Sequence, residues 1–255
     1  MIENKNISVN ERQRALIVTL LASILVFALW NWDAPQARWL LRPLRLFVTY
    51  VHEAGHSLAA VLTGGEIVKF LVSPDGSGLA YTAVGNRAII ISFGYLGAAL
   101  FGSLLFILAN RFSRYDNILA IALGIFMVGF TVMFARPDES GAWTAIIIGI
   151  VFGAVLILIG AFAPRSVTLL TLNVLAIITA LNAVMDIRYL LRSIDASRGT
   201  LSNDAVSFSE QVLGGVVPPT LVAFIWLLMA LGMFIFAIWF GVWKPLRQEI
   251  AYARS

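Results

Sequence analysis

The chain has 255 residues, of which 60% are hydrophobic and only 13% are charged, and its formal net charge is +4. Ordinary soluble domains carry about 25% charged residues, so this composition excludes a protein whose whole surface faces water. The basic residues lie in short clusters between apolar stretches, which is typical of the flanks of membrane spans. We therefore expect the protein to interact with the lipid bilayer and not with nucleic acid.

Seven segments are apolar enough to cross a bilayer as helices, since a span needs about 20 mostly apolar residues. These segments are residues 15–32, 39–62, 87–110, 117–135, 141–163, 166–192 and 217–243. We predict an all-α polytopic membrane protein with about seven transmembrane helices, folded as a single membrane-embedded domain over residues 1–255. A multi-pass protein of the cell membrane fits this pattern. Six spans are the alternative, because polar residues interrupt the segment 39–62.

Two segments depart from this helical pattern. Residues 64–86 place β-branched and aromatic residues on both sides of the turn Pro74-Asp75-Gly76-Ser77-Gly78, which predicts a short β-hairpin. Its strand 66–72 would offer an edge that can pair with an extended peptide. The second segment, 193–216, is polar and is expected to form a loop.

Small residues recur every fourth position in the third predicted span, at Gly94, Ala98 and Gly102. Such spacing lets two helices approach closely within a membrane. We therefore predict that this face packs against a neighbouring helix.

The segment 39–62 contains the only two histidines of the chain, in the sequence Val51-His52-Glu53-Ala54-Gly55-His56. Residues four apart lie on one face of a helix, so both imidazoles can bind one metal ion, with Glu53 beside the attacking water. Ionisable groups at membrane depth are costly and usually mark function. We predict one zinc ion held by His52 and His56, with Glu53 as the catalytic base.

A catalytic zinc ion normally has three protein ligands, and the chain offers no cysteine and no further histidine. Of the 14 acidic residues, only Glu53 and Asp186 fall within predicted spans, which makes Asp186 the first candidate for the third ligand. A local ion pair with Arg188 is the alternative role for Asp186. If every segment crosses, His52 and Asp186 differ in depth by on the order of 10 Å. Asp204, in the polar segment, is therefore a second candidate.

These motifs resemble the site-2 protease family of intramembrane zinc metallopeptidases, especially its small bacterial-type branch without a PDZ domain. The resemblance is carried by His52-Glu53-Ala54-Gly55-His56, Gly64-Gly65, Pro74-Asp75-Gly76-Ser77-Gly78 and Gly94-Tyr95-Leu96-Gly97. Asp186 and the stretch Ser202-Asn203-Asp204-Ala205 are similar to later acidic positions of that branch. The Leu-Asp-Gly motif that carries the third ligand in better-known members is absent here.

The resemblance implies a zinc-dependent metalloendopeptidase that cleaves membrane proteins or membrane-associated peptides. A non-proteolytic metal-binding scaffold or sensor is the alternative, but a purely structural site has no need of a base such as Glu53 beside its ligands. A transporter would show two related halves, and the sequence has no such internal repeat.

Overall fold

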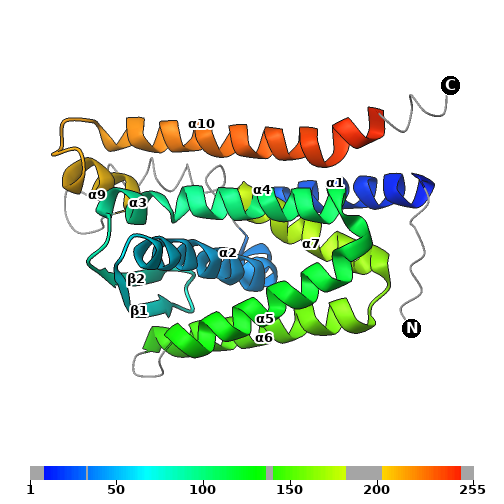
Figure 1. Ribbon diagram of the computed structural model, residues 1–255, viewed down its shortest axis with the longest axis horizontal. Coiled ribbons are helices and arrows are strands. Elements are labelled where there is room, and N and C mark those ends of the chain that lie inside the picture. Colours follow the sequence, from blue (N-terminus) through cyan, green and yellow to red (C-terminus); the bar gives the residue numbers. More distant parts are fainter. Residues whose placement is uncertain (1–8, 33, 136–139, 182–202, 248–255) are drawn as a thin grey trace.

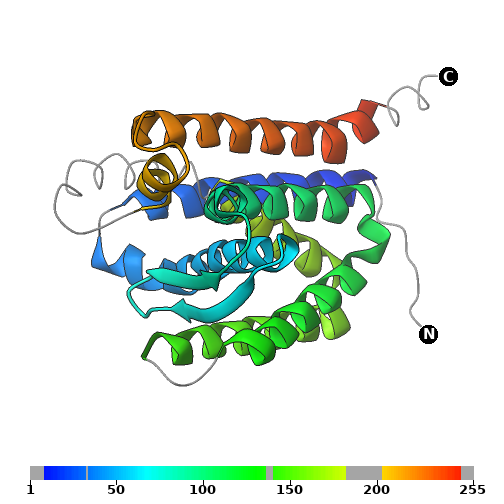
Figure 2. The same ribbon diagram turned by 60° about the vertical axis from the view of Figure 1, so that its left-hand side comes forward.

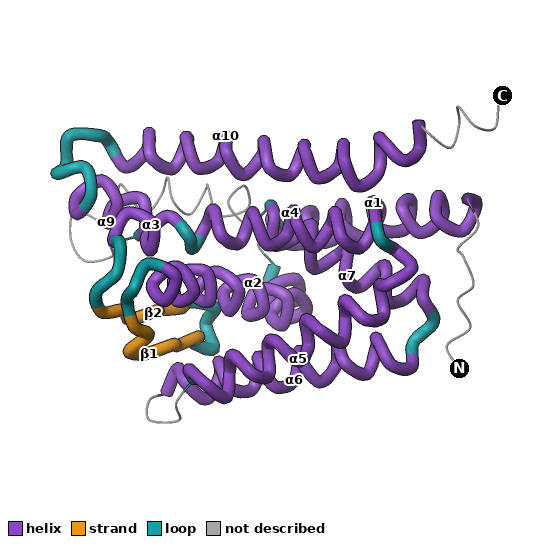
Figure 3. The backbone as a smooth tube through the Cα atoms, viewed as in Figure 1, coloured by secondary structure: helices purple, strands orange, loops and turns teal. Residues whose placement is uncertain are grey.

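The computed structural model describes residues 9–32, 34–135, 140–181 and 203–247, and the structural statements below concern these residues. Helices form most of this part of the chain, and one two-stranded sheet interrupts them (Figure 3). The helices are α1 (Val9–Asn31), α2 (Pro35–Leu62), α3 (Arg87–Ser92), α4 (Tyr95–Arg111), α5 (Asp116–Phe134), α6 (Ser140–Phe162), α7 (Arg165–Ala180), α9 (Asp204–Gln211) and α10 (Pro219–Ile238). A π-helical turn, Trp239–Trp243, continues α10.

The helices lie in layers that run along the long axis of the molecule. In Figure 1, α10 lies along one side, α5 and α6 lie together along the opposite side, and α2, α4 and α7 lie between them. The β-hairpin, α3 and α9 gather at one end (Figures 1 and 2).

Cations lie over aromatic rings where two of the apolar helices end. The Arg114 guanidinium lies 4.6 Å from the ring centre of Tyr115, and the Arg247 guanidinium lies 5.2 Å from that of Trp243. Aromatic and basic side chains of this kind are typical of a membrane–water interface.

Three described helical stretches are long and apolar enough to cross a membrane: Ser113–Phe134, Trp143–Phe162 and Pro219–Arg247. They match three of the seven predicted spans, and the prediction of a mostly helical membrane protein is confirmed. The predicted span 87–110 is divided by a turn at Phe93 and Gly94 into α3 and α4. The predicted span 166–192 is described as a helix only as far as Ala180. A count of seven spans stays a prediction.

The predicted hairpin is present as β1 (Glu66–Val72) and β2 (Gly78–Ala83), which pair in antiparallel register. Asp75 tightens the turn, because its Oδ1 accepts hydrogen bonds from the Ser77 backbone N–H at 3.0 Å and from the Ser77 hydroxyl at 2.7 Å. The φ angle of Gly76 is +96°, a conformation that glycine adopts without strain. Residues 74–78 were therefore a reliable turn signal.

The core beside the hairpin fixes which strand faces inward. Phe70 of β1 is fully buried, and its ring centre lies 5.0 Å from that of Tyr50 and 5.2 Å from that of Phe130. The Tyr50 hydroxyl hydrogen-bonds with the Thr131 hydroxyl at 2.8 Å and donates to the Met127 carbonyl at 3.2 Å. Because β1 packs between α2 and α6, it is held in the body of the protein.

The small residues of the third predicted span were expected to pack against a neighbouring helix, and Gly102 does so. A Cβ atom on Gly102 would lie 2.4 Å from the backbone nitrogen of Ala180, so the glycine lets α4 and α7 approach closely. The buried Asn110 of α4 also donates a 2.6 Å hydrogen bond to the side chain of Asn173 on α7. These contacts join the two central helices.

Candidate metal centre

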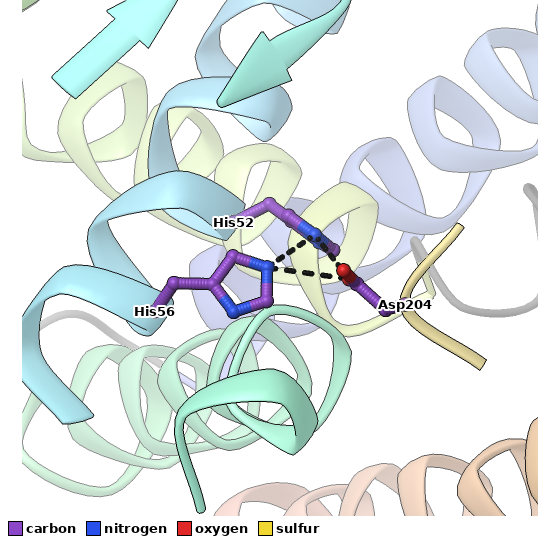
Figure 4. Close-up of side chains that lie close together, drawn as sticks. All are labelled: His52, His56 and Asp204. Atoms are coloured by element: carbon purple, nitrogen blue, oxygen red, sulfur yellow. Dashed lines mark hydrogen bonds and ion pairs between the residues drawn. The ribbon is translucent and has the colours of Figure 1, made fainter. Parts of the chain in front are cut away.

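The two histidines of α2 point toward one another and toward Asp204 (Figure 4). Their Nε2 atoms lie 3.1 Å apart. Asp204 Oδ2 lies 2.9 Å from His52 Nε2 and 3.2 Å from His56 Nε2. Three potential ligand atoms therefore meet at one point, although Asp204 lies 152 residues after His52 in the chain.

This arrangement fits a zinc ion. Ligands bound about 2.1 Å from a tetrahedral zinc lie roughly 3.4 Å from one another, and the three observed separations are only slightly shorter. Two imidazole nitrogens and one carboxylate oxygen are also a donor set that suits zinc. A small adjustment of the side chains would make room for the ion.

Gly94 keeps the space in front of the imidazoles open. A Cβ atom at this position would lie 2.4 Å from His56 Nε2 and 2.5 Å from His52 Nε2. The turn between α3 and α4 thus brings backbone without a side chain against the Nε2 atoms of both imidazoles. Gly94 does not serve the helix packing that its spacing indicated, but borders the candidate metal site.

A backbone carbonyl fixes the orientation of His56. The Nδ1 atom of this buried ring lies 2.7 Å from the carbonyl oxygen of Ile90 in α3, and the carbonyl can only accept. Nδ1 therefore carries a proton, and Nε2 is the ring nitrogen that faces His52 and Asp204, where it is available to bind a metal ion. The His52 ring is in edge contact with Tyr95, at 4.7 Å between ring centres.

Asp204 occupies the first position of α9. The side chain of Asn203 caps this helix, because its Oδ1 accepts a 3.0 Å hydrogen bond from the Val206 backbone N–H. Burial raises the pKa of the Asp204 carboxyl, but the adjacent imidazoles of His56 and His52 outweigh burial and hold this pKa well below its usual range. The carboxyl is therefore ionised, as a metal ligand must be.

Aromatic side chains hold α9 in place. The ring of Phe208 on α9 lies 5.4 Å from that of Trp226 on α10, and the ring of Trp226 lies 6.1 Å from that of Tyr95. Since Tyr95 also contacts His52, a continuous row of rings joins α9 to the histidine helix. The carboxylate and the imidazoles are thus positioned by the same packing.

Glu53 is buried against the hairpin. Its side chain is close to Gly78 of β2, where a Cβ atom would lie 2.5 Å from Glu53 Oε1, and the backbone of Ala80 hydrogen-bonds to its carboxylate. Thr49, one turn earlier on α2, donates a 2.8 Å hydrogen bond to the Gly76 carbonyl. The hairpin is therefore fastened over the face of α2 that carries the acid.

The strand that reaches this acid is β2, whereas the sequence pointed to 66–72 as the edge for a peptide. The physical reason is that the side chains of Phe70 and Val72 in β1 are fully buried in the core. β1 packs between α2 and α6, and the backbone shown in contact with Glu53 belongs to β2, at Gly78 and Ala80.

The structure brings together His52, His56 and Asp204, the last of which was the second candidate for the third ligand. Asp186, the first candidate, lies outside the described residues. The roles of Gly78 and Gly94 were missed, because a glycine that leaves room for another side chain carries no chemical signature in the sequence. The Asn203 cap was readable, since asparagine commonly precedes the first turn of a helix.

The profile of the Peptidase M50B-like family matches residues 19–237. The chain belongs to this family. Comparison with curated proteins gave no match, and comparison with solved structures gave none either. The Peptidase M50B-like match confirms the resemblance to the site-2 protease family, and it covers both α2 and Asp204.

Proposed function

We propose that this Peptidase M50B-like protein is an intramembrane zinc metallopeptidase that hydrolyses peptide bonds of membrane proteins or membrane-associated peptides. The observation that carries the proposal is the meeting of His52, His56 and Asp204, with the buried Glu53 on the same helix as the histidines. The apolar helices support a multi-pass protein of the cell membrane as its setting.

The zinc ion would be held by His52, His56 and Asp204. When bound, it would act as a Lewis acid that acidifies water and polarises the scissile carbonyl. The carboxylate of Glu53 would accept the proton of the attacking water and later deliver it to the leaving amine. The Ala80 backbone orients that carboxylate. The Ile90 carbonyl keeps the proton of His56 on Nδ1 throughout.

A substrate helix must unwind locally before attack, because its peptide bonds are protected by its own hydrogen bonds. We propose that the β2 strand, Gly78–Ala83, lies along the extended peptide and helps to hold it open. The closeness of Gly78 to Glu53 supports this placement.

Substitution of Glu53 tests the proposed reaction. In Glu53→Gln we expect zinc to remain bound while cleavage of quenched apolar peptides in detergent micelles falls by about 10²–10⁴-fold, since the amide cannot take up the proton. Metal content and peptide hydrolysis are measured on the same preparation. Glu66→Gln, the same change at an exposed acid of β1, is the control and should leave both values unchanged. Undiminished cleavage by Glu53→Gln would refute the proposal.

Gly78→Ala should separate the placement of the base from metal binding. The nearest neighbours of the added Cβ would be Glu53, at Oε1 and Cγ, and Thr49, and none of the three ligand atoms. A displacement of the acid by about 1 Å can cost 10²-fold in rate. We expect turnover to fall by about this factor with zinc retained. Gly232→Ala on α10, the same change at a position where a Cβ atom meets nothing within 4 Å, is the control. Equal turnover in the two variants would show that β2 does not hold the acid.

A further inference from the structure

A second site lies in the apolar cavity between α2, α4 and α5. Its volume is about 250 Å³, and its walls include Gly55 and Leu58 of α2, Leu104 of α4, and Phe126 and Met127 of α5. The ligand atoms of His52, His56 and Asp204 are not part of its lining. The cavity is therefore distinct from the metal centre, although it borders the helix that carries both histidines.

The chemistry of the walls excludes a polar ligand. The only side-chain hydroxyl among the lining residues belongs to Tyr50. That hydroxyl already hydrogen-bonds with Thr131 and with the Met127 carbonyl. A ligand in this cavity would find no free polar side chain, so a polar molecule would lose its hydrogen bonds to water without replacement.

The mouth of the cavity lies at the depth of the hydrocarbon layer. Phe126 and Leu104 line it and are 49% and 48% exposed. Phe126 lies ten residues after Asp116 and eight before Phe134, the ends of the spanning helix α5, which is roughly 15 Å and 12 Å along its axis. The hydrocarbon core of a bilayer is about 30 Å thick, so the mouth opens near its middle, where acyl chains are the surrounding molecules.

We propose that this cavity binds one acyl chain of a membrane phospholipid. The space is sufficient for a segment of the chain, because an apolar cavity of about 150 Å³ in another protein admits benzene and this cavity is larger, at about 250 Å³. The acyl chain lies against Gly55, within the His-Glu-x-x-His motif, and fills the space where α2 faces α4 and α5. This site does not depend on the proposed peptidase activity.

Photo-labelling tests the proposal on the full-length protein in liposomes. The probe is phosphatidylcholine with a diazirine near the end of one acyl chain, diluted into unlabelled phosphatidylcholine. We expect label on peptides carrying Leu104 and Phe126 to saturate with probe concentration, as binding to one site requires. Label on the exposed outer face, as at Ile118 and Leu158, should rise linearly, because it reports lipid in general contact with the protein.

Two matched variants distinguish the cavity from the surrounding surface. Leu104→Trp places a ring in the mouth, whereas Leu108→Trp makes the same change one turn along α4, at a 41% exposed position outside the lining. If the ring displaces two methylene groups of the acyl chain, saturable labelling should fall about tenfold in Leu104→Trp alone.

A second blocking variant, Leu58→Trp on α2, guards against misfolding of the first, and circular dichroism checks the helix content of each. Equal saturable labelling in the blocking and control variants would overturn the proposal. Linear labelling of every peptide in the wild-type protein, with no saturable component, would do the same without relying on any variant.

Discussion

Gly94→Ala should remove the metal from the protein. The new methyl group would lie 2.4 Å and 2.5 Å from the two imidazole Nε2 atoms, well inside van der Waals contact, and would crowd the proposed zinc position that both nitrogens face. Gly94 has φ −58° and ψ −66°, which alanine adopts freely. Any loss of zinc in this variant therefore comes from the methyl group and not from backbone strain.

The measurement is zinc content of the purified protein, expected to fall from one ion per chain to almost none, with peptide hydrolysis lost in parallel. Gly129→Ala is the control, because a Cβ atom there meets nothing within 4 Å. Thermal unfolding of both variants reports whether the fold survives. A full complement of zinc in Gly94→Ala would show that the ion does not lie where the three side chains meet.

The fold was predictable where the signal is local. Uninterrupted apolar stretches predicted α5, α6 and α10, and the Pro-Asp-Gly-Ser-Gly turn predicted the hairpin, because each depends on neighbouring residues only. The break at Gly94 was not predictable in the same way, since hydropathy is continuous from Ala88 to Ala109. The three-dimensional arrangement explains this break, because the backbone turns where the Nε2 atoms of His52 and His56 approach it.

In the candidate site, too, the local part was predictable from the sequence and the part that depends on tertiary packing was not. The pair His52 and His56 follows from one helical turn, so the sequence was enough to place both rings on one face. The third group could not be chosen that way, because it depends on how distant helices pack. Asp186 was favoured for its place in an apolar span, whereas Asp204 lies in a polar segment that folds locally into α9 and returns to the histidines.

Asp204→Ala should be the most damaging change among the acidic residues outside α2. Loss of the partner that orients a metal ligand typically weakens metal affinity by about 10–100-fold, and loss of the ligand itself should exceed this. We expect zinc affinity, measured by competition with a chelating dye, to fall by more than about 100-fold. Asp204→Asn tests the charge alone, since the amide keeps the shape but is a weaker ligand.

Asp186→Ala is the decisive comparison, because two imidazoles and the Asp204 carboxylate would already supply the three protein ligands that a catalytic zinc needs. This variant should keep its zinc. If Asp186→Ala loses the ion and Asp204→Ala keeps it, the first candidate from the sequence is the ligand and the carboxylate on α9 has another role. Comparable losses in both variants would instead indicate that both acids are needed to hold the ion. The zinc affinities of these two variants therefore identify the third ligand, and the comparison requires no substrate.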